Sequence, residues 1–151
     1  MSADEPVKIL ELISLEVADQ EYCLDVNAVR EIRGWAPATP LPQSPDYIRG
    51  VINLRGTIMP VLDLRRRLGL GLTEPSSRHV IVVVEASNKL AGVLVDGVRE
   101  TFKIGEDQLQ APPRFEGDED RFVDAIIPID ERMISRLVVT SLLGESVALA
   151  A

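Results

Sequence analysis

Short apolar runs separated by turn residues fill most of this chain, and that pattern predicts strands. Residues 8–17 end in an alternation that places Ile13, Leu15 and Val17 on one side of a strand. Residues 79–85 form an unbroken, mostly β-branched run, which is typical of a strand buried on both faces. Such segments number about nine or ten, with only scraps of helix between them. The pattern therefore predicts an all-β fold made of one barrel or a pair of barrels.

Residues 50–64 are the stretch around which the other segments are arranged. Two apolar runs flank residues 55–57, as expected for a β-hairpin whose tight turn uses the conformational freedom of glycine. Asp63 then precedes a short polar run that stops at Gly69. We expect Asp63 to cap a short helix there, with Gly69 ending it.

The end of the chain repeats this outline and hints at two similar β lobes. A strand over residues 124–129, a turn at 130–132 and a strand over 133–139 precede a short helix that Thr140 caps and Gly144 ends. We expect a disordered start at residues 1–7, one folded unit over 8–144 with its lobes divided in the Gly/Pro/Ser-rich loop 69–78, and a fraying tail at 145–151.

Apolar residues also cluster in the segment that follows the second expected strand. Val26 and Val29 lie three positions apart, so a helical turn places them on one side. Ile32 extends that side if the helix continues, but residues 31–33 fit a strand equally well. Two interpretations stay open: these side chains cover the mouth of a barrel, or they form an exposed apolar patch that marks a partner site.

Arg55 and Glu31 carry opposite charges in segments that the proline-rich stretch 36–45 separates. A pair between them would fix the two segments together. An exposed ion pair adds little to stability, so we expect such a pair to matter for geometry and recognition more than for folding.

Composition and charge narrow the class of protein. The chain has 151 residues, 46% of them hydrophobic and 26% charged, which is typical of a soluble globular protein. A net charge of −8 argues against a nucleic-acid binder, because phosphate contacts need a basic face. No apolar run approaches the roughly 20 residues of a membrane span, and the start is not a signal peptide. With Cys23 as its single cysteine, the chain is expected to stay in the cytoplasm without an internal disulfide.

Catalytic and metal-binding patterns are missing from the sequence. The single histidine, His79, opens a buried strand, and no spacing supports a Ser/His/Asp set or a metal site with Cys23. The acidic residues 116–120 lack the order of a calcium loop and are expected to form a solvated loop. The arginines at 65–67 suit an exposed helix face better than an acidic partner. We therefore expect no enzyme, no cofactor and no metal.

Several motifs resemble those of a known family. They are EIRG at residues 31–34, YIRGVINLRG at 47–56, IMPVLDLR at 58–65, GVLVDGV at 92–98 and DERM at 130–133. Together they resemble the CheW family of bacterial chemotaxis coupling proteins, over roughly residues 8–143. The same module occurs inside a larger histidine kinase and fused to a receiver domain, but a chain of this length fits the free-standing form.

The resemblance implies an all-β fold of two SH3-like five-stranded β-barrels with short helices around a shared hydrophobic centre, and no catalysis. It implies an adaptor that couples the cytoplasmic tip of transmembrane chemoreceptors to the regulatory domain of the histidine kinase CheA, scaffolds the receptor array, and is recruited from the cytoplasm to membrane-associated arrays. The kinase-facing surface would lie at the ends of the barrels. The receptor-facing groove would comprise Ile13, Val26, Val29, Ile32 and Val98, with Arg55 and Glu31 beside it.

One departure from the family pattern and two other functions need to be kept in view. Ser135 and Arg136 interrupt a run that is usually apolar, so the final hairpin is expected to be a sheet edge or a modified partner surface. A second hypothesis is a small β-barrel that binds a ligand or an oligonucleotide, but the acidic balance and 4% aromatic content weigh against base stacking. A third is an enzyme whose cofactor brings the chemistry.

Overall fold

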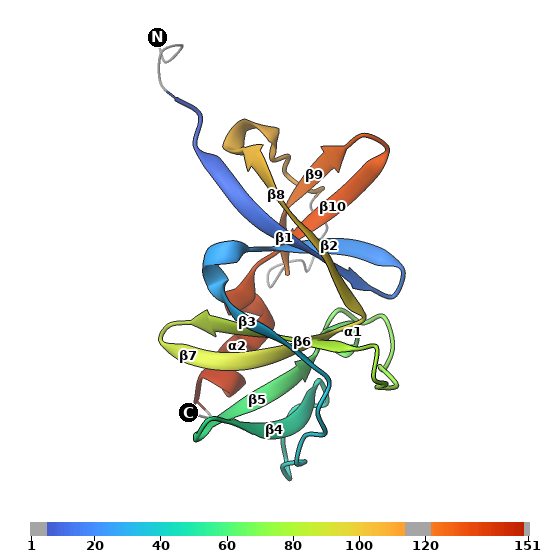
Figure 1. Ribbon diagram of the computed structural model, residues 1–151, viewed down its shortest axis with the longest axis vertical. Helices are drawn as coiled ribbons and strands as arrows, with labels where there is room; N and C mark the ends of the chain where they lie inside the picture. Colours follow the sequence, from blue (N-terminus) through green and yellow to red (C-terminus); the bar gives the residue numbers. More distant parts are fainter. Residues whose placement is uncertain (1–5, 114–121, 150–151) are drawn as a thin grey trace.

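The computed structural model describes residues 6–113 and 122–149, and strands dominate it (Figure 1). The first half of the chain forms β1 (Ile9–Val17), β2 (Gln20–Asp25), β3 (Val29–Gly34), β4 (Ile48–Leu54), β5 (Thr57–Asp63) and the helix α1 (Leu64–Arg67). The second half forms β6 (Val80–Ala86), β7 (Lys89–Val95), β8 (Gly97–Gly105), β9 (Val123–Ile129), β10 (Arg132–Leu137) and the helix α2 (Val139–Leu149). Two 3-10 turns, η2 (Val26–Ala28) and η3 (Glu106–Gln108), complete the described elements.

The strands form two five-stranded sheets, and each sheet curls into a barrel. The first barrel has the strand order β8-β1-β2-β10-β9, and the second has the order β3-β6-β7-β5-β4. In the first barrel, Gln110, which follows β8, forms a bridge with Ile126 of the edge strand β9, and in the second, Thr39, which follows β3, forms one with Val51 of the edge strand β4. The predicted all-β fold with two five-stranded barrels is thus confirmed.

The second barrel is an insertion within the first. Its five strands lie in residues 29–95, whereas the first barrel uses β1 and β2 and then β8, β9 and β10. The chain passes from one barrel to the other at η2 and returns at Asp96. The loop 69–78, where the sequence places the division between lobes, instead joins α1 to β6 inside the second barrel. Its Gly/Pro/Ser composition identifies a loop but carries no information about which strands pair.

Along the chain, the same elements form two repeats, β1 to α1 and β6 to α2. In each repeat two antiparallel strands precede a third strand that crosses to the other barrel, and a hairpin and a helix follow. Asp63 N–H donates to the Tyr47 carbonyl, and Val138 N–H donates to the Phe122 carbonyl at the same place in the second repeat, both at 2.8 Å. The outline that the sequence shares between residues 50–69 and the chain end is therefore a repeat of three-dimensional structure.

The two helices follow the expected signals unequally. Asp63 caps α1 by accepting from Arg66 N–H at 3.4 Å, and Gly69 follows with a φ of 76°, as predicted. Helix α2 begins at Val139, ahead of the expected Thr140 cap. Gly144, with φ 67° and ψ 175°, kinks α2, and helical backbone resumes as far as Leu149. The expected stop at Gly144 is met, because the first helical segment of α2 ends at this non-helical glycine and a second segment follows it. The expectation that the chain frays from residue 145 stays a prediction.

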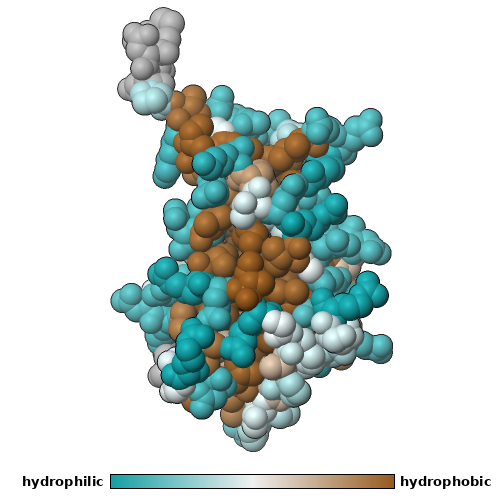
Figure 2. All heavy atoms as spheres, in the orientation of Figure 1, coloured by the Kyte–Doolittle hydropathy of each residue, from teal (hydrophilic) through white to brown (hydrophobic). Residues whose placement is uncertain are grey.

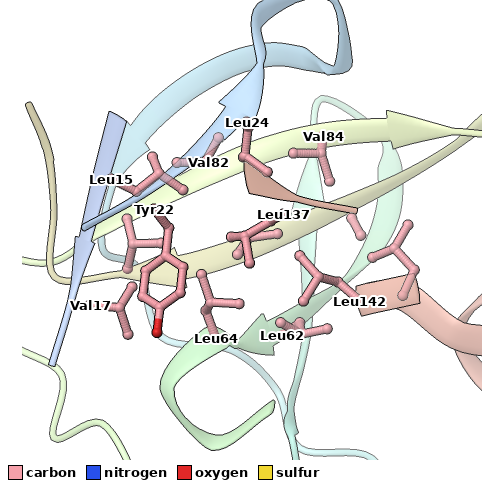
Figure 3. Packing of buried hydrophobic residues seen from close by; sticks show 14 of the residues in the cluster. Leu15, Val17, Tyr22, Leu24, Leu62, Leu64, Val82, Val84, Leu137 and Leu142 are labelled. Carbon is pink, nitrogen blue, oxygen red and sulfur yellow. The ribbon is translucent and has the colours of Figure 1, made fainter. Parts of the chain in front are cut away.

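Three clusters of apolar side chains hold the molecule together. One lies inside the first barrel and includes Leu10 and Leu12, and another lies inside the second barrel. The third and largest, which we call the shared core, lies between the barrels and takes residues from both. Figure 3 shows its packing. Its labelled members are Leu15, Val17, Tyr22 and Leu24 from the first repeat's opening hairpin and Leu62, Leu64, Val82, Val84, Leu137 and Leu142 from the elements around it.

Several local expectations can be compared with this architecture. Ile81 to Val84 are fully buried, which confirms that β6 is covered on both faces. The strand expected from Val98 to Ile104 exists as β8, but it pairs with β1 in the first barrel rather than extending the sheet of β6 and β7. The acidic residues 116–120 lie outside the described residues.

Candidate functional site

A β-bulge in β3 puts Val29 and Ile32 on the same side of a strand. The sequence pattern could put them on one side only by continuing a helix. Val29 lies opposite Val84, Ile32 lies opposite Val82, and the register shifts at Arg30 between them. Side chains of directly opposed residues point to the same face, and Val82 and Val84 both belong to the shared core. Because of the extra residue, Val29 and Ile32 share that side despite their three-residue spacing. Of the two structures left open for this segment, the strand is the one that forms.

The other apolar residues assigned to the site converge on the same region. Val26 in η2, Val29 in β3 and Val98 in β8 are all partly buried and pack against the shared core. Val98 lies opposite Leu15 of β1. Ile13, on the same side of β1, is only 5% exposed and is a member of the core itself. Ile13 therefore supports this surface from beneath.

We call the surface formed by Val26, Val29, Ile32 and Val98 the seam, because it lies where the two barrels meet. Ile32 is its most accessible residue, at 46% exposed, while the three valines are partly buried. Figure 2 shows hydrophobic residues running down the middle of this face, across the level of β8 and β3. The valines both cover the core and present part of their surface to the outside, so the two interpretations of this segment are compatible.

The charged pair lies on the other side of β3. Glu31 lies opposite Val83, which belongs to the core of the second barrel, and its carboxylate accepts a hydrogen bond from the Arg55 guanidinium. This hydrogen bond holds the pKa of Glu31 below its usual range. The pair joins β3 to the turn between β4 and β5, as the sequence suggested. The structure thus brings Arg55 and Glu31 together but separates them from the face that carries Val29.

A second ion pair accompanies the first. Arg30, the bulged residue of β3, bonds Glu85 of β6. The two pairs border a shallow hollow of about 510 Å³, and Leu54, Val83 and Leu90 line it between the charges. This end of the second barrel therefore presents alternating charges around an apolar floor, which suits recognition of a protein surface.

A buried carboxylate that the sequence pattern assigned only to a helix cap also fixes the loop beyond α1. Asp63 is fully buried and accepts from Thr73 N–H at 3.0 Å and from Thr73 Oγ1–H at 2.6 Å. Arg49 donates to the same carboxylate at 3.2 Å and to the Thr73 carbonyl at 3.1 Å. The sequence identified Asp63 only as a helix cap, because nothing in the spacing shows that Thr73 folds back onto it.

The three arginines of α1 have three different environments, so the expectation of one exposed helix face is wrong. Arg66 pairs with the exposed Asp46 at 2.8 Å. Arg65 Nε donates to the Leu70 carbonyl at 3.3 Å. Arg67 turns inward and donates to carbonyls of α2. Helical spacing separates the three side chains by about 100° each, so neighbouring arginines point in different directions.

The final hairpin is partly a sheet edge. β9 is an edge strand in the strand order of the first barrel. β10 is an inner strand between β9 and β2, and it pairs with β2 in parallel at Ser135 and Arg136. The charge of Arg136 is paired within the hairpin, because its guanidinium donates two hydrogen bonds to the Asp124 carboxylate, at 3.0 and 2.8 Å. Near the turn of this hairpin, Met133 is 66% exposed.

The remaining candidate groups have structural surroundings. Cys23 is buried, and burial raises the pKa of its thiol to about 12, which keeps it protonated and unreactive. His79 accepts from Ser76 N–H at 3.0 Å through Nδ1, and its Nε2 lies 3.3 Å from Asp96. Among the described residues, no three His, Cys, Asp or Glu side chains gather as metal ligands. In the same part of the chain, no helix has the length and apolar character to cross a membrane.

Two interlocked barrels, an apolar seam and paired charges at a barrel end are features suited to a module that binds other proteins. Comparison with known proteins specifies it further. The CheW-like domain family matches residues 11–147. A probable chemotaxis protein CheW from Rhizobium etli is 43% identical over 142 residues, covering 93% of this chain and 92% of that protein. The chemotaxis protein CheW from Rhizobium meliloti is 45% identical over 125 residues, covering 82% and 81%.

A solved structure agrees with these relatives. The crystal structure of the scaffolding protein TtCheW from Thermoanaerobacter tengcongensis matches with a TM-score of 0.82 and 33% sequence identity, covering 90% of this chain and 93% of that one. The chain belongs to the CheW-like domain family.

Proposed function

We propose that this chain couples the cytoplasmic tip of transmembrane chemoreceptors to the regulatory domain of the histidine kinase CheA and helps to build the receptor array. Its family consists of non-catalytic chemotaxis scaffolding proteins, so the contribution of the chain is binding. We place it in the cytoplasm, recruited to membrane-associated arrays through its partners, without insertion into the membrane.

The observation that carries the receptor contact is the seam. Val26, Val29 and Val98 come from three different elements and pack against one core, and Ile32 lies opposite Val82, a member of that core. A helical receptor tip presents a narrow apolar stripe, and a row of partly exposed aliphatic side chains is a suitable surface for one. Arg55 and Glu31, on the other side of β3, would serve orientation and neighbouring contacts.

The kinase contact is assigned to the ends of the barrels. The second barrel ends in the charge-bordered hollow beside Arg55, and the first ends at the hairpin that exposes Met133. Surfaces at the ends leave the seam free, so one chain binds receptor and kinase at the same time. Two modest affinities then reinforce each other through effective concentration. The chain passes on a signal if its contacts differ between the receptor's signalling states.

The test is a binding assay with a receptor cytoplasmic fragment and a CheA regulatory domain, separately and together, using isothermal calorimetry and co-sedimentation. Val29→Asp and Ile32→Ser alter the seam at a partly buried and an exposed position. Val7→Asp is the matched control, because Val7 is 48% exposed and lies ahead of β1. Circular dichroism melts verify that each variant folds.

We expect the wild-type chain to form a three-part complex. Both seam variants should weaken receptor binding at least tenfold while kinase binding persists, and Val7→Asp should bind like the wild type. Binding of either partner alone but never both together would refute the bridging role. Equal receptor affinity in wild type and Ile32→Ser, with both folded, would remove the seam from the receptor contact.

A further inference from the structure

Arg67 occupies an unusual place between the two repeats. It is the last residue of α1, yet its guanidinium reaches α2 at the end of the chain. Nε donates to the Leu142 carbonyl at 2.9 Å, and a terminal nitrogen donates to the Ser141 carbonyl at 3.1 Å. These carbonyls need partners because the helix is interrupted at Gly144, where the backbone leaves the helical conformation. Arg67 thus caps α2 from another element, with a charge of the sign that a helix C-terminus favours.

Two aromatic rings hold this guanidinium in position. It lies 4.0 Å from the ring centre of Tyr47 and 4.8 Å from that of Phe122. Tyr47 and Phe122 occupy equivalent places in the two repeats, since each offers its carbonyl to the residue that precedes a helix. Arg67 is therefore bound by both repeats at once, between matching aromatic residues.

Gly144 is shaped to admit the arginine. A Cβ atom at this position would lie 3.1 Å from an Arg67 terminal nitrogen and 3.6 Å from the Tyr47 hydroxyl. The φ of 67° at Gly144 also disfavours any residue with a side chain. Space, backbone and hydrogen bonds at this point all fit the guanidinium.

The helix that Arg67 holds belongs to the same apolar cluster as the seam. Leu142 and Leu143 are buried members of the shared core, and Val26, Val29 and Val98 pack against that core. Close-packed interiors transmit displacements from one side to another. A shift of α2 would therefore change the support beneath the seam.

We propose that Arg67 is a positioning residue for partner binding, because it clamps α2 onto the shared core and thereby fixes the arrangement of the seam. This inference rests on the proposed function for its consequence, namely receptor affinity. Its physical content, the dependence of the seam on the seating of α2, stands independently of which partner binds there.

Three variants separate the clamp from loss of charge. Arg67→Met removes the donors and keeps an apolar stem, and Arg67→Lys keeps the charge but loses the planar two-donor geometry. Arg66→Met is the matched control, since Arg66 is the adjacent residue and its side chain pairs with Asp46 on the exposed surface, away from α2. Amide hydrogen exchange is followed at Leu142 and Leu143 and at residues 26–29, and receptor-fragment affinity is measured by calorimetry.

In Arg67→Met we expect amide exchange to rise about tenfold in α2 and several-fold at residues 26–29, with a several-fold weaker receptor affinity. Arg67→Lys should fall between Arg67→Met and the wild type, and Arg66→Met should match the wild type. Faster exchange confined to α2, with residues 26–29 unchanged, would overturn the inference. If the wild type binds no receptor fragment, the proposed function fails, and the exchange at residues 26–29 still decides the clamp.

Discussion

The two barrels share one strand plan but differ in chemistry at matched positions. Gly50 lies opposite Val61 in the second barrel, and Ala125 lies opposite Arg136 at the same distance from its turn in the first. Asp63, which precedes α1, corresponds to Val138, which precedes α2. The strand plan needs only apolar alternation and turns. Where matched residues differ, one barrel has a structural feature that the other lacks. Asp63, for example, binds Thr73 in the loop after α1, which Val138 could not do.

The seam shows the same principle on the surface. Val29 and Val98 are matched, since each sits at the start of a crossing strand, beside a register shift and opposite a shared-core residue. Beyond the shift, Ile32 of β3 lies opposite Val82, whereas Thr101 of β8 lies opposite Ile13. The repeats thus build a nearly symmetric apolar centre with one apolar and one polar flank. A receptor helix bound there would meet two different sides, which gives it a defined direction.

Replacing Asp63 by valine, the residue found at the matched position, should have the largest effect. Thr73 and Arg49 would lose their acceptor in a buried place, so we expect the free energy of unfolding to fall by about 3–5 kcal/mol. Urea unfolding at neutral pH measures it. Asp46→Val, which removes an exposed carboxylate, is the control and should change stability little. Equal losses in the two variants would show that the buried hydrogen bonds of Asp63 contribute no more to stability than an exposed carboxylate does.

Replacing Gly50 by alanine, the residue found at the matched position of the first barrel, should have the second largest effect on stability. A Cβ there would lie 2.2 Å from the Thr39 carbonyl oxygen, and the φ of 144° disfavours a side chain. We expect Gly50→Ala to cost about 2–3 kcal/mol by opening the bridge between Thr39 and Val51. Gly34→Ala is the control, because nothing lies within 4 Å of its added Cβ. Thermal melts of both variants decide the point, and similar melting temperatures would contradict it.

The buried thiol of Cys23 should make the free energy of unfolding depend on pH. The second barrel has no equivalent group, since the residue of β7 that matches Cys23 is Gly92. Its thiol pKa is raised to about 12 by burial, above the usual value of about 8.5 in an unfolded chain. The free energy of unfolding is therefore unaffected by this group below about pH 8.5. It falls by at most about 1.4 kcal/mol per pH unit as the pH rises toward 12, because the unfolded chain loses the thiol proton first. Urea unfolding at pH 7, 9 and 10 should show a steeper fall in wild type than in Cys23→Ala. Parallel curves would exclude this contribution.

Removing Arg55 should change stability least. Its side chain is 73% exposed, so we expect Arg55→Ala to melt within a degree or two of the wild type while three-part complex formation weakens. The control for stability is Asp130→Ala, because Asp130 occupies a matched turn with a similar φ of 55° against 49° for Arg55, and it should also melt close to the wild type. A large loss of melting temperature in Arg55→Ala would assign that residue a structural role instead.

Local signals in the sequence were sufficient for most elements. For the seam they singled out Val26, Val29 and Ile32, whereas Val98 was assigned to it only through the family resemblance. The hairpin at residues 55–57, the Asp63 cap and the buried β6 each depend on a few neighbouring residues. The insertion of one barrel within the other depends on pairing between distant strands, which no local pattern encodes. The bulge at Arg30 and the inward turn of Arg67 likewise depend on what lies opposite them. The receptor-facing assignment itself stays a prediction.

The insertion has a consequence for how the chain is made. During translation the second barrel receives its last strand at Val95, before β8 has begun at Gly97. The β1–β2 hairpin, with apolar residues such as Leu12 and Leu15 on both faces, has by then left the ribosome without the strands that complete its barrel. That hairpin must wait for β10, which ends at Leu137. The nascent chain thus carries a first hairpin with exposed apolar side chains until β10 is made. This hairpin is the segment most prone to aggregation, and it is where chaperones would be needed.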